Sequence, residues 1–115
     1  MKLYHTSGSP PSRSVLMTFR NLQLNVDVNV LDLMGGEHMK DDFVKLNPLH
    51  QVPFLVDGDF MMSESRAIMA YLVNSQKHES SSFYPIESKA RARVDQRLYY
   101  DATVVFPSIA NILVK

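Results

Sequence analysis

Three segments of this 115-residue chain combine residue types that bind ligands, and the first is the loop at residues 7–12. It joins an expected strand to an expected helix, where free backbone N–H groups and the helix dipole favour an anion. The hydroxyl of Ser9 can add one more hydrogen bond. Spacing alone favours the plainer interpretation that these Ser, Gly and Pro residues only form a loop. The Gly-x-Ser-x-Gly pattern of serine nucleophiles is absent, which disfavours covalent catalysis by Ser9.

The second segment is the Val52-Pro53 dipeptide, at the start of an expected strand. If its peptide bond is cis, the backbone N–H and C=O of Val52 can pair with an extended peptide, which then adds to the sheet as a strand. Only about 5–6% of X–Pro bonds are cis, so base rates favour the alternative, a trans proline on an edge strand.

The third segment, Glu64-Ser65-Arg66, lies at the start of another expected helix. Ser65 and its backbone N–H can hold a carboxylate at the amino end of the helix, and Glu64 can accept hydrogen bonds from an ammonium group. A carboxylate site beside an ammonium site suits the α-amino acid end of a ligand. Helix capping with a solvated charge pair is the simpler explanation, and this segment taken alone favours it.

His38 and His50 are the remaining titratable candidates, and both can donate to a ligand carboxylate. Their spacing does not match a metal site and no carboxylate cluster accompanies them, so we expect no metal. A lone histidine is more often a surface residue than a ligand. The chain has no cysteine, which excludes disulfides, cysteine-based zinc sites and any mechanism that uses a thiol of the protein.

The composition is that of an ordinary globular protein, with 45% hydrophobic and 21% charged residues. Twelve Lys and Arg balance twelve Asp and Glu, which argues against a nucleic-acid-binding domain and against a polybasic membrane-surface protein. The first ten residues carry no secretory signal, and the longest apolar run, residues 67–73, is too short to span a bilayer. We therefore expect a cytoplasmic protein that binds neither nucleic acid nor membrane.

Hydrophobic periodicity predicts the elements that must position these candidates. Strands are expected at residues 2–6, 25–33, 52–56 and 59–62. Helices are expected from residue 12 to about residue 22, at 38–46, and from the cap residues 63–65 to residue 75. The Asp57-Gly58 pair between two apolar runs is a strong hairpin signal. The resulting β-α-β-α-β-β-α order implies an α/β fold, in which helices pack on a small mixed sheet.

The last part of the chain has helical periodicity only. Val94, Leu98 and Ile109 fall near helical spacing, and Pro107 is expected to kink the helix. An isolated amphipathic helix cannot bury its apolar stripe, so this segment needs packing partners. We predict a first domain at residues 1–79, a polar linker at 80–85, and the truncated start of an all-helical second domain at 86–115.

Several blocks of residues occur together in a fixed order and spacing. They are Ser9-Pro10-Pro11-Ser12-Arg13-Ser14, Gly36-Glu37-His38, Asn47-Pro48-Leu49-His50-Gln51-Val52-Pro53, Asp57-Gly58 and Glu64-Ser65-Arg66-Ala67-Ile68. In this combination the sequence resembles the cytosolic glutathione transferases, and most closely the insect delta and epsilon classes. The resemblance runs through the whole chain. It implies a thioredoxin-like βαβαββα domain that binds glutathione, followed by the start of an all-α domain.

The resemblance also implies which residues bind glutathione, γ-Glu-Cys-Gly. Ser9 would be the catalytic hydroxyl, which donates a hydrogen bond to the glutathione thiolate. His50 and His38 would face the glycine carboxylate. Ser12 stands where the delta class often has cysteine, a departure that should be tolerated because the reactive sulfur belongs to the ligand.

The other implied contacts involve the middle and the γ-glutamyl end of glutathione. Val52, before a cis Pro53, would pair through its backbone with the cysteine of the ligand. Glu64 and Ser65 would hold the γ-glutamyl ammonium and carboxylate, with Arg66 nearby. Glutathione is a co-substrate in this family, so no cofactor is expected.

The implied function is a glutathione transferase that conjugates the thiolate to hydrophobic electrophiles, a detoxification reaction of xenobiotic metabolism, in a homodimer. Two alternatives stay open: a transferase-like module for binding or scaffolding, and a truncated glutathione binder without turnover, because the family's second domain supplies most of the electrophile pocket. The missing cysteines exclude a thioredoxin or glutaredoxin oxidoreductase.

Overall fold

The computed structural model describes residues 1–76 and 82–114, and the chain divides into two compact units, Met1–Leu72 and Val73–Lys115. The elements that begin in the first unit are β1 (Lys2–His5), α1 (Pro10–Asn21), β2 (Asp27–Val30), the 3₁₀-helix η1 (Glu37–Met39), α2 (Asp41–Leu46), β3 (Phe54–Asp57), β4 (Phe60–Met62) and α3 (Ser65–Ser75). Their order confirms the βαβαββα prediction.

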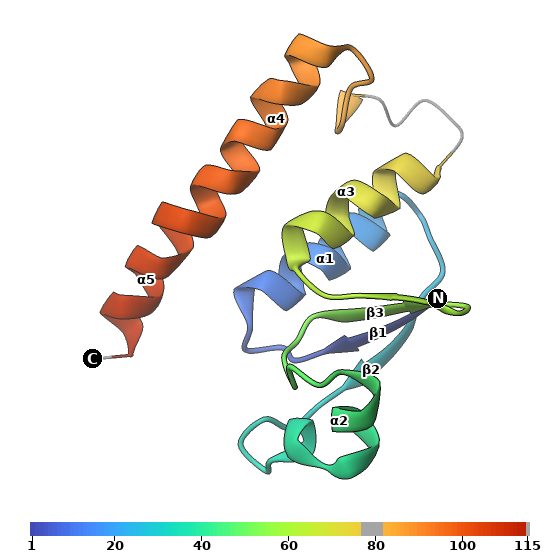
Figure 1. Cartoon of the computed structure of the whole chain (residues 1–115), viewed down its shortest axis with the longest axis vertical. Coiled ribbons are helices and arrows are strands. Elements are labelled where there is room, and N and C mark those ends of the chain that lie inside the picture. Colours follow the sequence, from blue (N-terminus) through green and yellow to red (C-terminus); the bar gives the residue numbers. More distant parts are fainter. Residues whose placement is uncertain (77–81, 115) are drawn as a thin grey trace. The chain divides into compact units, whose positions relative to one another are not determined.

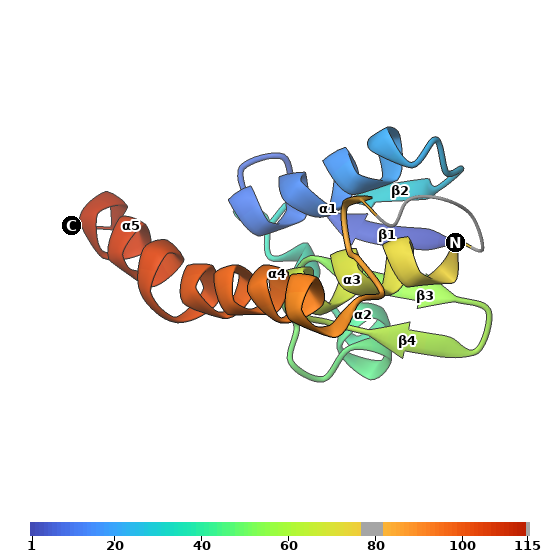
Figure 2. The same ribbon diagram turned by 90° about the horizontal axis from the view of Figure 1, so that it is seen from above.

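The four strands form one mixed sheet in the order β2-β1-β3-β4. β1 runs parallel to β2 and antiparallel to β3, and β3 runs antiparallel to β4. Helices α1 and α3 cover one face of the sheet and α2 covers the other (Figures 1 and 2). These directions bring the carboxyl ends of β1, β2 and β4 and the amino end of β3 to one end of the sheet. We call this the site end.

Alternation along β1 separates two apolar layers. Leu3 is fully buried in the core on the side of α1 and α3, where Val15 and Phe19 lie four residues apart on α1. The complete core cluster consists of Leu3, Val15, Phe19, Leu55, Ile68 and Leu72. Tyr4 points to the opposite face, where its ring centroid lies 5.1 Å from that of Phe43 on α2. Each face of the sheet therefore packs its own helices.

The sequence-based prediction of a single helix at residues 38–46 is wrong. Lys40 has extended backbone angles, φ −67° and ψ 144°, and it separates η1 from α2. Its carbonyl accepts the N–H groups of Phe43 and Val44, each at 3.0 Å, so Lys40 is the N-cap of α2. The periodicity was misleading at Met39, which is 54% exposed. The turn at Lys40 lets α2 bury Phe43 against the sheet.

The second unit contains α4 (Ser88–Tyr100), the π-helical segment η3 (Asp101–Val105) and α5 (Phe106–Leu113). Glu87 caps α4, because its carboxylate accepts the N–H groups of Lys89 and Ala90 at 2.9 and 2.8 Å. These hydrogen bonds lower the pKa of Glu87. Pro107 is the second residue of α5, the helix that directly follows η3. A π-helical turn therefore precedes the proline, which lacks the N–H that a regular helix would use.

The predicted domain boundary after residue 79 and the first residues of the predicted linker lie outside the described residues. The rest of the linker is tied to α4. Tyr84 donates to the Asp95 carboxylate at 2.8 Å, Arg91 donates to the Pro85 carbonyl at 2.7 Å, and the Arg91 guanidinium lies 4.1 Å from the centre of the Tyr84 ring. Between residues 1 and 76 and between 82 and 114, no helix is long and apolar enough to cross a membrane.

A hydrogen bond between α3 and β3 provides a test of the fold. The hydroxyl of Tyr71 donates to the Asp57 carboxylate at 2.6 Å, and this bond raises the pKa of Tyr71 above its usual 10.0. Because the folded-state pKa is the higher one, the bond stabilises the protein below pH 10.0, and its contribution is lost as the pH rises through the folded-state pKa.

We expect Tyr71→Phe to lower the free energy of unfolding at pH 7 by about 1 kcal/mol, because the bond is partly exposed to solvent. Denaturant unfolding at neutral and alkaline pH measures this, and the difference from wild type should shrink above the folded-state pKa. Tyr100→Phe is the matched control, because Tyr100 is 59% exposed. Equal stability losses in the two variants would contradict the assigned bond.

Candidate functional site

The strand directions bring the four separate stretches that carry the candidate residues to the site end of the sheet. Ser9 follows β1, His38 follows β2, His50, Val52 and Pro53 precede β3, and Glu64, Ser65 and Arg66 lie at the junction of β4 and α3. Strand directions alone account for this convergence, because β3 is antiparallel to the strands on both of its sides.

Ser9 is the N-cap of α1. Its backbone is extended, with φ −92° and ψ 117°, and its Oγ accepts the backbone N–H of Ser12 at 3.3 Å. Pro10 and Pro11 occupy the first helical positions, where a missing N–H costs nothing. The hydroxyl proton of Ser9 has no acceptor among the described residues, and the side chain is partly exposed. The hydroxyl can therefore donate to an anion at the positive end of the helix dipole.

Ser12 supports this cap from inside the fold. It is fully buried, and its Oγ has no hydrogen-bond partner in the described part of the chain. Its contribution to the site is the backbone N–H that Ser9 accepts. No solvent reaches the Ser12 side chain, so a direct contact with a ligand there would require local movement.

The Val52–Pro53 peptide bond is cis, as the family resemblance implies and against the base rate. Pro53 is buried, Val52 is partly exposed, and β3 begins one residue later, at Phe54. Neither the N–H nor the C=O of Val52 pairs with another described backbone group. An added extended peptide requires a residue at the edge of the sheet whose backbone N–H and C=O are both unpaired.

Sequence reasoning missed the residue that holds this loop. Asn47 is 3% exposed, and its side-chain amide donates to the carbonyl of Gln51 at 2.8 Å. Its Oδ1 accepts the N–H of Leu49, and its backbone carbonyl accepts the N–H of His50 at 2.8 Å. The Asn-Pro pair is a turn signal that marks such a residue. Asn47 thus fixes the loop from which His50 and Val52 project.

His38 and His50 lie close together, with ring centroids 6.2 Å apart. The Nδ1 atom of His38 is buried and has no partner within the described ranges. His50 is exposed and has a left-handed backbone, with φ 42°. Two imidazoles at this distance can donate to the same carboxylate. Within residues 1–76 and 82–114, no three His, Asp or Glu side chains form a group that could hold a metal ion.

Glu64 adopts a conformation that local sequence does not predict. Its φ is 70°, in the left-handed region that non-glycine residues rarely occupy, and its carbonyl accepts the N–H of Ile68 at 2.9 Å. Such strain is concentrated at functional sites. The Glu64 side chain is exposed, whereas Ser65 is 3% exposed and its Oγ accepts from the Arg66 guanidinium at 3.0 Å. Arg66 therefore orients the Ser65 hydroxyl, and no described residue accepts its proton in the hydrogen bonds of this segment.

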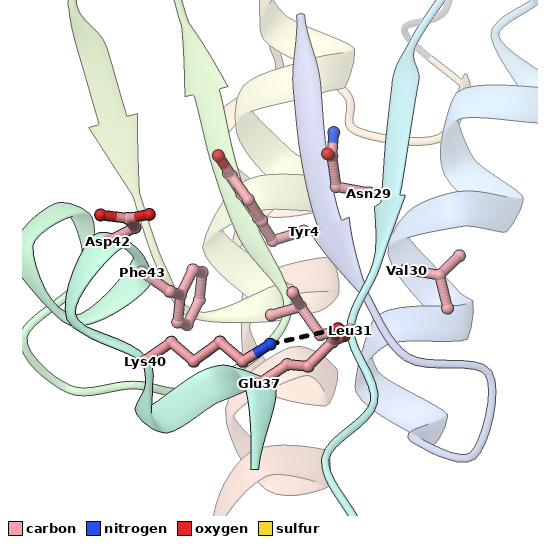
Figure 3. A pocket seen from close by; sticks show the side chains of 8 residues that line it. All are labelled: Tyr4, Asn29, Val30, Leu31, Glu37, Lys40, Asp42 and Phe43. Carbon is pink, nitrogen blue, oxygen red and sulfur yellow. Dashed lines mark ion pairs between the residues drawn. The ribbon is translucent and has the colours of Figure 1, made fainter. Parts of the chain in front are cut away.

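A cavity of about 350 Å³ lies between β1, β2 and α2 (Figure 3). It is lined by Tyr4, Asn29, Val30, Leu31, Glu37, Lys40, Asp42 and Phe43. None of these belongs to the candidate residues. Glu37, which lines the cavity, directly precedes His38 in η1, so the cavity borders the loop that carries this candidate.

Comparisons with known proteins agree with this geometry. The family described as "Glutathione S-transferase, N-terminal domain" matches residues 3–80. Glutathione S-transferase 1 of Manduca sexta is 42% identical over 117 residues, which cover 98% of this chain and 52% of that protein.

Two solved structures are similar as well. A delta-class glutathione transferase of Nilaparvata lugens has a TM-score of 0.89 and 41% identity, over 96% of this chain and 51% of its own. An epsilon-class glutathione S-transferase of the housefly, Musca domestica, has a TM-score of 0.92 and 38% identity, over 98% of this chain and 52% of its own. This chain thus spans about half the length of the proteins it matches. By the family match, the identity and the shared fold, the chain belongs to the glutathione S-transferase family.

Proposed function

We propose that this chain binds glutathione at the site end of the sheet and activates its thiol for transfer to hydrophobic electrophiles. The observation that carries the proposal is Ser9, an N-cap whose hydroxyl proton has no acceptor among the described residues, at the same end of the sheet as Val52, whose N–H and C=O pair with no other described backbone group. The family membership supports it, because glutathione is the substrate that gives the family its name.

Each part of the tripeptide has a chemically matched partner in this proposal. The cysteine backbone pairs with the N–H and C=O of Val52, as an added strand. His38 and His50 donate to the glycine carboxylate. Glu64 accepts from the γ-glutamyl ammonium, and Ser65 donates to the γ-glutamyl carboxylate at the amino end of α3.

The thiol must lose its proton to react. A free thiol with a pKa of ~8.5 is only a few per cent thiolate at neutral pH. Lowering that pKa by about two units requires roughly 2.7 kcal/mol. A hydrogen bond from Ser9 to the thiolate, worth about 1.5–3 kcal/mol, and a helix dipole worth about 0.3–1 kcal/mol are of the right size.

The bond-forming step follows from the thiolate. Its sulfur attacks an electrophilic carbon of an apolar substrate, a C–S bond forms, and the leaving group departs with the bonding electron pair. The thiol proton has already passed to solvent, and Ser9 remains a donor without covalent change. Further parts of the proposal are detoxification as the role, a homodimer as the assembly, the cytoplasm as the location, and a first domain that ends at residue 79.

Calorimetric titration with glutathione tests the proposal directly. We expect one site per chain, with oxidised glutathione and free cysteine as weaker-binding controls. Turnover of a chlorinated aromatic substrate then separates a transferase from a glutathione binder without catalysis. The absence of any glutathione binding would reject the proposed function and leave only a transferase-like fold.

A further inference from the structure

The loop between β2 and α2, residues 31–40, closes on itself through two acidic residues. The backbone N–H of Asp32 donates to Oε2 of Glu37 at 2.6 Å, and the backbone N–H of Glu37 donates to the carbonyl of Asp32 at 3.0 Å. The Asp32 carboxylate in turn accepts the N–H of Gly35 at 2.9 Å. We call these three hydrogen bonds the Asp32–Glu37 latch.

The two glycines of this loop favour the latch. A Cβ atom on Gly35 would lie 2.5 Å from Oδ2 of Asp32, so any other residue there would push the Asp32 carboxylate out of its position in the latch. Gly36 has a φ of 75°, which favours glycine, and it is the N-cap of η1. The Asp-Leu-Met-Gly-Gly-Glu segment therefore favours the closed loop, and the Glu37 side chain adds the bond to the Asp32 N–H that closes it.

His38 is carried by this loop. It follows Glu37 in η1, a single turn held by the bond from the Met39 N–H to the Gly36 carbonyl at 2.9 Å. No hydrogen bond links the imidazole of His38 to any residue that the structure describes. The position of the ring therefore depends on its packing, which includes the His50 ring 6.2 Å away, and on its backbone, which the latch holds.

We infer that Glu37 and Asp32 are positioning residues that hold His38 toward the glycine carboxylate of glutathione. The inference rests on the proposed glutathione site. Because His38 would contact only the glycine end of glutathione, the latch should affect the binding of that end alone. Glu37 acts here through its bond to the Asp32 N–H. Its ion pair with Lys40, at 3.8 Å, joins side chains that are 37% and 68% exposed and contributes little (Figure 3).

The test compares two ligands in three variants. Glutathione has the glycine carboxylate and γ-glutamylcysteine lacks it. If Glu37→Ala leaves His38 in place in about a tenth of the molecules, the Kd for glutathione rises about tenfold. The Kd for γ-glutamylcysteine should stay within about twofold of wild type. Glu37→Gln keeps an oxygen that accepts the Asp32 N–H and should restore affinity. Lys40→Ala is the control and should bind both ligands like wild type.

A loss of the same size for both ligands in Glu37→Ala would overturn the inference, because it would indicate general damage to the fold. Unchanged affinity for glutathione would overturn it as well. Amide hydrogen exchange on the free protein gives a readout that needs no ligand. Exchange at Asp32 should become faster in Glu37→Ala and stay slow in Glu37→Gln. If wild type fails to bind glutathione, the proposed function is wrong. If exchange at Asp32 is the same in Glu37→Ala as in wild type, the latch is absent in solution.

Discussion

Ser9→Ala is expected to remove the thiolate signal of bound glutathione at neutral pH. The hydroxyl proton of Ser9 is the free donor at the amino end of α1, and the substitution deletes it. Loss of a charge-assisted hydrogen bond of about 1.5–3 kcal/mol raises the thiol pKa by about one to two units. From a wild-type pKa about two units below ~8.5, the thiolate fraction at pH 7 then falls by roughly 3- to 25-fold. Ultraviolet difference spectra of the complex against pH measure this pKa.

The same serine also caps α1, so an alanine variant mixes two effects. Loss of an N-cap side chain costs about 1 kcal/mol of stability, whereas glycine at the N-cap costs only a few tenths. Ser9→Gly therefore removes the hydroxyl and largely keeps the helix, and it should lose the thiolate signal as fully as Ser9→Ala. Ser9→Thr keeps a hydroxyl and should retain part of the signal.

Ser7→Ala is the matched control, because Ser7 lies exposed in the same loop and caps nothing. It should leave the thiol pKa of bound glutathione unchanged. A thiolate signal that survives in both Ser9→Ala and Ser9→Gly would remove Ser9 from the mechanism. The helix dipole would then be the remaining source of thiol activation.

Glu64→Ala is expected to weaken glutathione binding by roughly 10- to 150-fold, because it deletes the acceptor of the ligand's ammonium group, worth about 1.5–3 kcal/mol. Calorimetric titration measures the change. The left-handed backbone at Glu64, φ 70°, complicates an alanine variant, since alanine is also strained there. Glu64→Gly relieves that strain while removing the carboxylate, so it should fold at least as well and still bind poorly.

Two comparisons show whether the loss belongs to the ammonium contact. Asp59→Ala removes an exposed carboxylate from the β3–β4 turn and should leave the glutathione Kd near that of wild type. A glutathione analogue without the amino group should bind wild type about as weakly as glutathione binds Glu64→Ala. If Glu64→Ala discriminates between the two ligands as strongly as wild type does, the γ-glutamyl assignment fails.

The helices and strands were largely predictable because their signals are local. Two-residue alternation marks the strands, and Val15 and Phe19 mark the buried stripe of α1. The prediction failed at residues 38–46, where Lys40 turns the chain out of a helix. That turn exists because Phe43 packs on Tyr4 of a distant strand, a contact that periodicity does not register.

The candidate residues could be named from their types and from the family resemblance, but their support could not. Asn47 and the Asp32–Glu37 latch hold the loops that carry His50 and His38, and both act through hydrogen bonds to backbone groups. A backbone partner leaves no trace in residue spacing. The left-handed φ of Glu64 was likewise invisible, since the local sequence has no glycine there to signal it.

The amino-acid sequence by itself determined the order of elements, and it determined that none of these 115 residues can supply a thiol, because they include no cysteine. The tertiary structure decided that four separate stretches meet at one end of a sheet, that the Val52–Pro53 bond is cis, and that no described residue accepts the hydroxyl proton of Ser9. Local backbone preferences are encoded in neighbouring residues, whereas strand direction and hydrogen-bond partners depend on which distant segments pack together.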